Sequence, residues 1–171
     1  MLGSIFSAWN NRRIAAGYHG ETGMLIRETT ERLLPYGPEQ LFEIASDVER
    51  YPDFVPAWLA VRVRDRQAGA YCTDQVLGLG PLRLQFASRT VLDPPRRIEV
   101  TSTDAAFRQF GISWLFEGRA GACHVSLSVD VELRSRLSQA VLERLMPDTA
   151  GSIMAAFEQR ARQLCAPMKP A

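Results

Sequence analysis

The sequence predicts an α+β domain in which an antiparallel sheet is followed by a C-terminal helix. Two observations carry this prediction. Between residues 58 and 134, runs with period-two alternation of apolar and polar side chains follow one another, separated by Gly, Pro or Asp clusters at roughly ten-residue intervals. After them, residues 136–165 carry apolar side chains at helical spacing. Consecutive strands with short turns favour an antiparallel meander, and strands followed by a helix favour α+β over alternating α/β.

The first predicted elements are a strand and a short helix. Residues 25–34 form a β-tolerant run that ends at the turn cluster Pro35–Pro38. Pro38 suits the first position of a helix, so we expect a helix over 38–49, with apolar side chains at helical spacing at Leu41, Phe42, Ala45 and Val48. The segment Tyr51–Pro56 cannot continue this helix, because each of its two prolines disfavours helical dihedrals in the preceding residue. It is predicted to be a stiff, aromatic-rich connection.

Six strands are predicted after this connection. The last, 123–134, is the clearest, because every second residue from Cys123 to Leu133 is apolar and the alternate positions are polar. Such a strand has one dry face and one wet face. The helical pattern over 136–165 contains Pro147, which lacks an N–H donor and clashes with the preceding turn, so we expect a kink or break near Met146. The other five strands lie near 58–67, 70–79, 82–92, 96–103 and 109–117.

Length and composition indicate one globular domain. The chain has 171 residues, of which 46% are hydrophobic and 23% charged, and its net charge of +1 creates no overall field that would attract nucleic acid. Three cysteines and two histidines are spaced too widely for a disulfide scaffold or a zinc site. No apolar run approaches the roughly 18 residues of a membrane-spanning helix. We therefore expect no metal and a reducing, cytoplasmic compartment.

Glycines near residue 20 divide the chain. Gly17, Gly20 and Gly23 separate a leader, residues 1–23, from a folded domain over 24–165 that is followed by a tail over 166–171.

Four stretches of the chain carry a resemblance to a known family. The most specific is the run from Asp47 to Pro56, which reads Asp-Val-Glu-Arg-Tyr-Pro-Asp-Phe-Val-Pro; the others are Leu34–Tyr36, Trp114–Phe116 and Phe157–Ala161. Together with the order of predicted elements, they make residues 24–164 resemble the START-like helix-grip superfamily of polyketide cyclases and lipid-transport proteins, and within it the coenzyme Q-binding branch. The chain departs from that branch at Ala57-Trp58, where a Trp-Cys pair is usual, and at Pro147.

This resemblance implies a curved antiparallel sheet wrapped around a long C-terminal helix, with an apolar cavity between them. It implies that the cavity binds an isoprenoid quinone, with ubiquinone as the expected ligand, and that the protein is a carrier or chaperone supporting respiratory electron transport rather than an enzyme. Burial of the quinone tail would contribute about 0.8 kcal/mol per methylene. No catalytic residue and no catalytic cofactor is expected. The candidate cavity and gate residues are Tyr51, Phe54, Val55, Pro56, Trp58, Phe86, Phe110, Ile112, Trp114, Phe116, Ile153 and Phe157.

These candidate residues have a second interpretation. Plain core packing requires the same residue types as cavity lining, so the aromatic strand face from Phe110 to Phe116 fits either one, as do Phe86, Ile153 and Phe157. The segment Tyr51–Pro56 is either a rigid corner or the movable gate that the family resemblance implies.

Two other functions are kept open. A sister branch with the same fold and the same Tyr-Pro-x-Phe-Val-Pro signature comprises bacterial toxins that bind the large ribosomal subunit and block subunit association. Arg62, Arg64 and Arg66 share one predicted strand face, which is either a solvated, ion-paired surface or a docking patch for lipid headgroups or RNA phosphates. A cyclase or aromatase would need a polar acid–base pair inside the cavity, whereas the inward stripes are apolar.

Residues 1–16 are the candidate membrane contact. Leu2, Ile5, Phe6 and Trp9 recur at the spacing of one helical face, and no acidic residue occurs before Glu21. This pattern predicts weak, salt-sensitive binding at the inner face of the cytoplasmic membrane. The alternatives are a disordered tail or a helix packed on a second copy of the chain.

Overall fold

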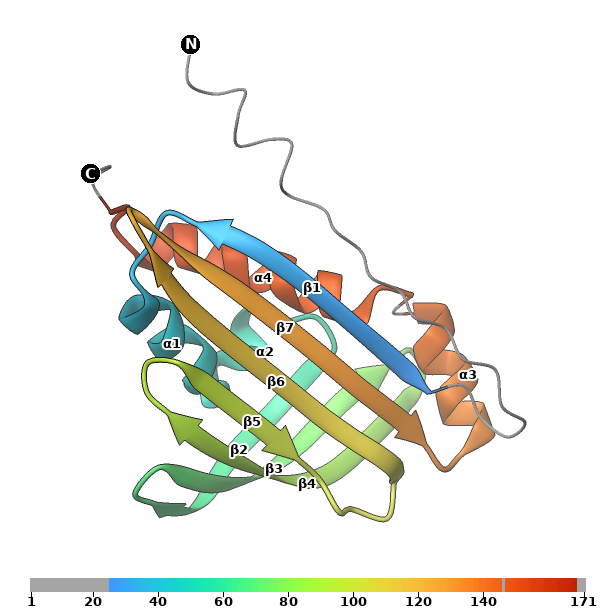
Figure 1. The fold of residues 1–171 in the computed structure, drawn as a ribbon. Helices are drawn as coiled ribbons and strands as arrows, with labels where there is room; N and C mark the ends of the chain where they lie inside the picture. Colours follow the sequence, from blue (N-terminus) through green and yellow to red (C-terminus); the bar gives the residue numbers. More distant parts are fainter. Residues whose placement is uncertain (1–24, 146, 169–171) are drawn as a thin grey trace.

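A seven-stranded antiparallel sheet forms the centre of the structure, a computed structural model that describes residues 25–145 and 147–168. The strand order is β1-β7-β6-β5-β4-β3-β2. Figure 1 shows the sheet curving around helix α4 (Thr149–Leu164), while helix α1 (Pro38–Ser46) packs against β5, β6 and α4. The arrangement confirms the predicted α+β class and the helix-grip architecture.

All seven predicted strands are present. β5 ends at Thr101, short of the predicted residue 103, because the next residues form a tight turn against β4. In that turn the Ser102 hydroxyl donates to the Ala87 carbonyl at 2.5 Å, and the Asp104 carboxylate accepts from the Ala87 amide at 3.1 Å. The strands are β1 (Ile26–Leu34), β2 (Trp58–Gln67), β3 (Ala70–Leu79), β4 (Leu82–Asp93), β5 (Arg97–Thr101), β6 (Phe107–Arg119) and β7 (Ala122–Leu133).

The core lies between the concave face of the sheet and α4. In β7 the apolar side chains from Cys123 to Leu133 are buried, whereas Ser126, Ser128 and the other alternate residues are half-buried on the convex face. This is the dry and wet alternation that the sequence predicts. β1 pairs with β7 in unbroken register from Ile26 opposite Val131 to Leu34 opposite Cys123.

The segment after α1 differs from the prediction. The α-helix ends at Ser46 instead of residue 49, and a 3-10 turn, η1 (Val48–Arg50), follows it. A further helical turn, α2 (Tyr51–Phe54), then occupies the predicted stiff connection. Tyr51 has helical dihedrals, φ −54° and ψ −38°, although it precedes Pro52.

Two hydrogen bonds explain this helical turn. The Val55 amide donates to the Tyr51 carbonyl at 2.7 Å, and the Tyr51 hydroxyl donates to the Ala45 carbonyl at 2.6 Å. Pro52 is tolerated because a residue in the first turn of a helix has no intrahelical acceptor for an N–H group. These two hydrogen bonds, which join residues at most six positions apart, outweigh the local preference of a residue that precedes proline.

Two helices take the place of one long C-terminal helix. α3 (Arg136–Leu145) ends shortly before Pro147, and α4 begins at Thr149, which confirms the predicted break. The Asp148 carboxylate caps α4 by accepting a hydrogen bond from the Gly151 amide at 3.2 Å. Glu28 of β1 accepts from the Ala150 amide at 2.8 Å, which anchors the start of α4 on the sheet.

The predicted leader, residues 1–23, lies outside the described residues, and so does the membrane contact predicted at 1–16. At the other end, the Met168 amide donates to the Pro35 carbonyl at 2.7 Å and ties the segment after α4 to the turn between β1 and α1. The division into leader, domain and tail stays a prediction. Among the described residues, no helix is long and apolar enough to span a bilayer.

The predicted arginine stripe is interrupted in the structure. After Arg64 a bulge breaks the pairing of β2 with β3, and Asp65 within it has a φ of 49°. Arg62 and Arg64 are exposed, but Arg66 leaves the stripe and lies with its guanidinium 5.4 Å from the centre of the Tyr71 ring. Bulges and charged side chains on an edge strand hinder pairing with another sheet, which gives this surface a structural role.

Candidate functional site

An apolar cavity of about 40 Å³ lies between the concave face of the sheet and the two C-terminal helices. Among the described residues that line it, only the Thr149 hydroxyl and the Trp58 indole N–H are polar side-chain groups. The lining residues come from β1, β2, β3, β4, β6, β7, α3 and α4 and are Ile26, Trp58, Leu77, Leu79, Leu84, Phe107, Phe110, Ile112, Val129, Val131, Leu133, Leu142, Thr149 and Ile153.

The volume of this cavity limits what it holds without rearrangement. One water molecule occupies about 30 Å³ of the liquid, and pockets for small ligands measure about 300–1,000 Å³. A cavity of about 40 Å³ is therefore closed to any ring-sized ligand in this conformation. Binding in the interior requires part of the wall to move.

Within the part of the chain that the structure describes, helix α3 packs mainly on two elements of the cavity wall. It packs on β3 and β7, and its Leu142 side chain faces the cavity. Gln139, which is 4% exposed, accepts a hydrogen bond from the Leu133 amide at the end of β7 at 2.9 Å. Figure 1 shows α3 at the end of the molecule, beyond the start of α4. We refer to the bond between Gln139 and Leu133 as the α3 latch.

Four of the predicted cavity residues line this cavity. They are Trp58, Phe110, Ile112 and Ile153. Phe86 lies directly behind the lining, with its ring centroid 5.4 Å from that of Phe110. The structure thus brings together five of the twelve candidates at or behind the cavity wall.

Three other candidates form solid core instead. The Trp114 and Phe116 rings stack with centroids 6.0 Å apart, and Phe157 of α4 packs 4.8 Å from Trp114 and 6.4 Å from Phe116. All three side chains are at most 2% exposed. They hold α4 against β6 and do not line the cavity.

Of the predicted gate residues, Tyr51 packs directly on Trp58. The Tyr51 ring packs edge-on at 6.0 Å from Trp58 and at 5.6 Å from Phe54. Burial raises the pKa of the Tyr51 phenol far above its ordinary value, with smaller contributions from Tyr71 and Asp47, so this group stays a neutral hydrogen-bond donor. Val55 is buried and Pro56 is exposed.

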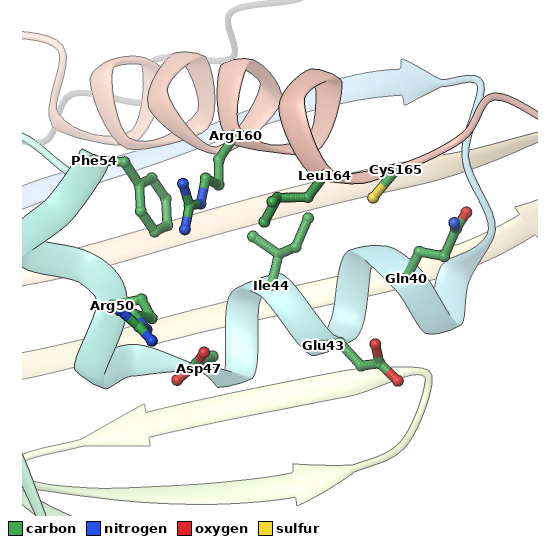
Figure 2. A pocket seen from close by; sticks show the side chains of 9 residues that line it. All are labelled: Gln40, Glu43, Ile44, Asp47, Arg50, Phe54, Arg160, Leu164 and Cys165. Atoms are coloured by element: carbon green, nitrogen blue, oxygen red, sulfur yellow. The ribbon is translucent and has the colours of Figure 1, made fainter.

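Phe54 faces a second depression, on the outside of the molecule. Figure 2 shows this outer cleft, of about 280 Å³, between α1, the η1–α2 segment and the end of α4. The Arg160 guanidinium lies 5.5 Å from the centre of the Phe54 ring, and Glu43 and Asp47 lie along α1. The cleft mixes apolar groups with both signs of charge, and its other lining residues are Gln40, Ile44, Arg50, Leu164 and Cys165.

Three leucines of β3 and β4 line the cavity but are not among the predicted cavity residues. They are Leu77, Leu79 and Leu84. The two-residue spacing of Leu77 and Leu79, and of Leu84 and Phe86, was the signal in the sequence that could have predicted them. Leu142 was included in no candidate list, although it belongs to the predicted helical pattern.

Two of the cysteine thiols lie where burial stabilises their protonated form. Burial raises the pKa of Cys123 to about 11 and also raises that of Cys165, which keeps both as unreactive thiols near neutral pH. Within residues 25–145 and 147–168, no group of three or more His, Cys, Asp or Glu side chains is placed to hold a metal ion.

Known proteins resemble this chain over most of its length. The profile of the family described as polyketide cyclase / dehydrase and lipid transport matches residues 34–158. The ribosome association toxin RatA of Pseudomonas aeruginosa is 32% identical over 133 residues, which cover 77% of this chain and 92% of that protein. The mitochondrial coenzyme Q-binding protein coq10 of Schizosaccharomyces pombe is 32% identical over 138 residues, covering 77% and 84%.

A solved structure agrees with the fold. The START superfamily protein from Mycobacterium smegmatis superposes with a TM-score of 0.65 and 16% identity, over 82% of this chain and 98% of that one. That likeness concerns the fold alone, whereas the profile match extends from the end of β1 into α4 and includes all described lining residues of the cavity except Ile26. The chain belongs to the polyketide cyclase / dehydrase and lipid transport family.

Proposed function

We propose that this protein binds an uncharged isoprenoid quinone of the ubiquinone type in its interior, without transforming it, and carries or protects the quinone in support of respiratory electron transport. The observation that carries the proposal is the apolar cavity between the concave face and helices α3 and α4. The coenzyme Q-binding relative supports the choice of a quinone.

The chemistry of the lining supports an uncharged lipid. No ionisable side chain belongs to the described lining of the cavity, so an anionic or cationic head group would lose its hydration there without a partner. A quinone ring carries only neutral oxygens, and its tail is purely apolar. Displacement of α3 would enlarge the cavity toward the size that such a ligand needs.

The proposal is tested by recovery of the bound ligand. Protein purified from a host that makes quinones is extracted with organic solvent, and the extract is analysed by mass spectrometry. Leu84→Trp places a larger side chain in the cavity, so we expect at least tenfold less quinone with this variant. Leu115→Trp is the matched control, since Leu115 is 38% exposed on the sheet and does not line the cavity. Equal recovery from both variants would refute the proposed site, and absence of quinone from the parent protein would refute the function.

A second candidate function is binding to the large ribosomal subunit. It is favoured by the relatives named ribosome association toxin, one of which is as similar in sequence as the coenzyme Q-binding relative. Arg62 is exposed on β2 and available for contacts with phosphate groups, whereas the neighbouring Arg64 is paired with Asp74 at 3.1 Å. Cosedimentation with isolated large subunits at moderate salt tests this function. Its loss on Arg62→Glu, with quinone recovery unchanged, would assign the two activities to separate surfaces.

The proposed carrier exchanges its ligand with a membrane through residues 1–16. Flotation with anionic liposomes compares the full chain with a chain that begins at Met24. Equal flotation of the two would remove this segment from the proposal.

A further inference from the structure

A buried cluster of polar side chains lies beside the cavity on the concave side of the sheet. We call it the polar wall, and it consists of Trp58, Thr73, Gln75 and Ser88, each at most 9% exposed. The Trp58 indole N–H donates to Gln75 Oε1 at 2.8 Å. Gln75 Nε2 donates to Thr73 Oγ1 and to Ser88 Oγ, both at 2.8 Å, and the two hydroxyls share a further bond of 2.8 Å.

The polar wall continues the lining of the cavity along the same strands. Residues at two-residue spacing face the same side of a strand, so Leu77, Gln75 and Thr73 follow one another on the inner face of β3. Opposite them on β4, Leu84 pairs with Leu77 and Ser88 pairs with Thr73. Leu77 and Leu84 line the cavity, and Trp58 belongs to both the lining and the polar wall. A ligand that extends along this face reaches the polar wall within about 7–14 Å, or one to two residue pairs.

One hydrogen-bond donor of the polar wall is left over. Its four side chains carry five N–H and O–H hydrogens, and the four hydrogen bonds use four of them. Whichever of Thr73 and Ser88 donates in their shared bond, the hydrogen of the other hydroxyl meets no acceptor among the hydrogen bonds of the described residues. A buried O–H of this kind favours an incoming oxygen acceptor, since an unmade buried hydrogen bond is costly.

Packing alone does not require these polar residues. Replacing a hydrogen-bonded buried group by apolar groups of the same shape is often neutral for stability. Neither the polar wall nor the described cavity lining includes an ionisable side chain, so the spare hydroxyl faces an environment that rejects phosphate and carboxylate groups.

We infer that the polar wall is the head-group end of the cavity, where the spare hydroxyl donates a hydrogen bond to a neutral carbonyl oxygen on a lipid ring. The inference rests on the proposed function, because it requires the cavity to accept a lipid. It assigns the specificity for quinone or ketone head groups over hydrocarbons and charged lipids to Thr73, Gln75 and Ser88.

The experiment measures the affinity of delipidated protein for two probes, ubiquinone-2 and a saturated hydrocarbon of the same tail length. Both inner variants carry Thr73→Val, Gln75→Leu and Ser88→Ala, and they add either Trp58→Phe or Trp58→Leu, so that no hydroxyl, amide or indole hydrogen of the polar wall is left to donate to a ligand. The matched control is Thr29→Val/Ser128→Ala, which removes a cross-strand hydroxyl pair, 3.0 Å apart, from the convex face. We expect the preference for ubiquinone-2 over the hydrocarbon to fall about two- to tenfold in both inner variants and to stay unchanged in the control.

The outcomes separate this inference from the proposed function. If the inner variants keep the parent protein's preference for ubiquinone-2 over the hydrocarbon, the head-group role is wrong while lipid binding stands. If the parent binds neither probe, the proposed function and the inference both fail. If the inner variants do not fold, the affinities of the parent protein for the two probes test the inference. Equal affinities for ubiquinone-2 and the hydrocarbon would overturn it, and a preference for ubiquinone-2 would support it.

Discussion

Removal of the α3 latch should speed the entry of ligand into the cavity. In the closed structure the buried Leu133 amide depends on the Gln139 side chain, at 2.9 Å, for its hydrogen bond. Gln139→Ala leaves that amide without its partner, which costs about 1–3 kcal/mol in the closed state. In an open state with α3 displaced, the amide is hydrated and the same substitution costs little. The open population should therefore rise about 5- to 150-fold.

The assay is stopped-flow quenching of tryptophan fluorescence by ubiquinone-2, since Trp58 lines the cavity. When opening equilibrates faster than binding, the uptake rate rises in proportion to the open population. Hydrogen exchange of the α3 amides should accelerate by a similar factor. Leu137→Ala is the control, because Leu137 is 68% exposed on the same helix. An unchanged uptake rate in a Gln139→Ala variant that exchanges faster at α3 would refute α3 as the entrance.

Three further predictions concern stability. Phe157→Ala should lower the free energy of unfolding, measured by urea denaturation, by about 3–5 kcal/mol, because this ring is 1% exposed and fills the core rather than the cavity. A loss below about 1 kcal/mol would contradict that placement. Ala57→Gly should raise the same quantity by about 0.5–1 kcal/mol, since Ala57 has a φ of 70°, whereas Ala60→Gly in the extended strand β2 should lower it. Burial raises the pKa of Tyr71 from 10.0 to about 12, so the stability that its neutral form contributes is complete below pH 10 and is lost as the pH rises toward 12, by about 3 kcal/mol at most. Tyr71→Phe should make the unfolding free energy less pH-dependent in that range, and an unchanged slope would contradict the assignment.

Local periodicity and covalent geometry determined most of the fold from the sequence. The alternation from Cys123 to Leu133 predicts a strand with one buried face, because successive side chains of a strand point to opposite sides. Pro147 predicts a kink or break between α3 and α4, because a proline inside a helix removes one hydrogen bond and its ring clashes with the preceding turn. The family resemblance added the curvature of the sheet around the last helix, which neither pattern contains.

Tertiary structure decided which inward side chains meet a cavity and which fill the core. Periodicity places Phe110, Ile112, Trp114 and Phe116 on one strand face, but only the position of α4 along that face leaves the first two at the cavity and buries the last two against Phe157. A cavity is the space that the packed side chains leave unfilled. Its position and volume therefore depend on every element around it.

The same reason applies to the turn at Tyr51 and to the polar wall. The helical dihedrals of Tyr51 depend on a hydrogen bond to Ala45, and the meeting of Thr73 with Ser88 depends on the register between β3 and β4. The apolar and polar periodicity around each of these residues predicts its strand or helix, but it does not predict which other residue it contacts. The sequence by itself therefore determined the elements, their order and their buried faces, whereas the three-dimensional packing alone decided how those faces combine into a cavity with a polar end.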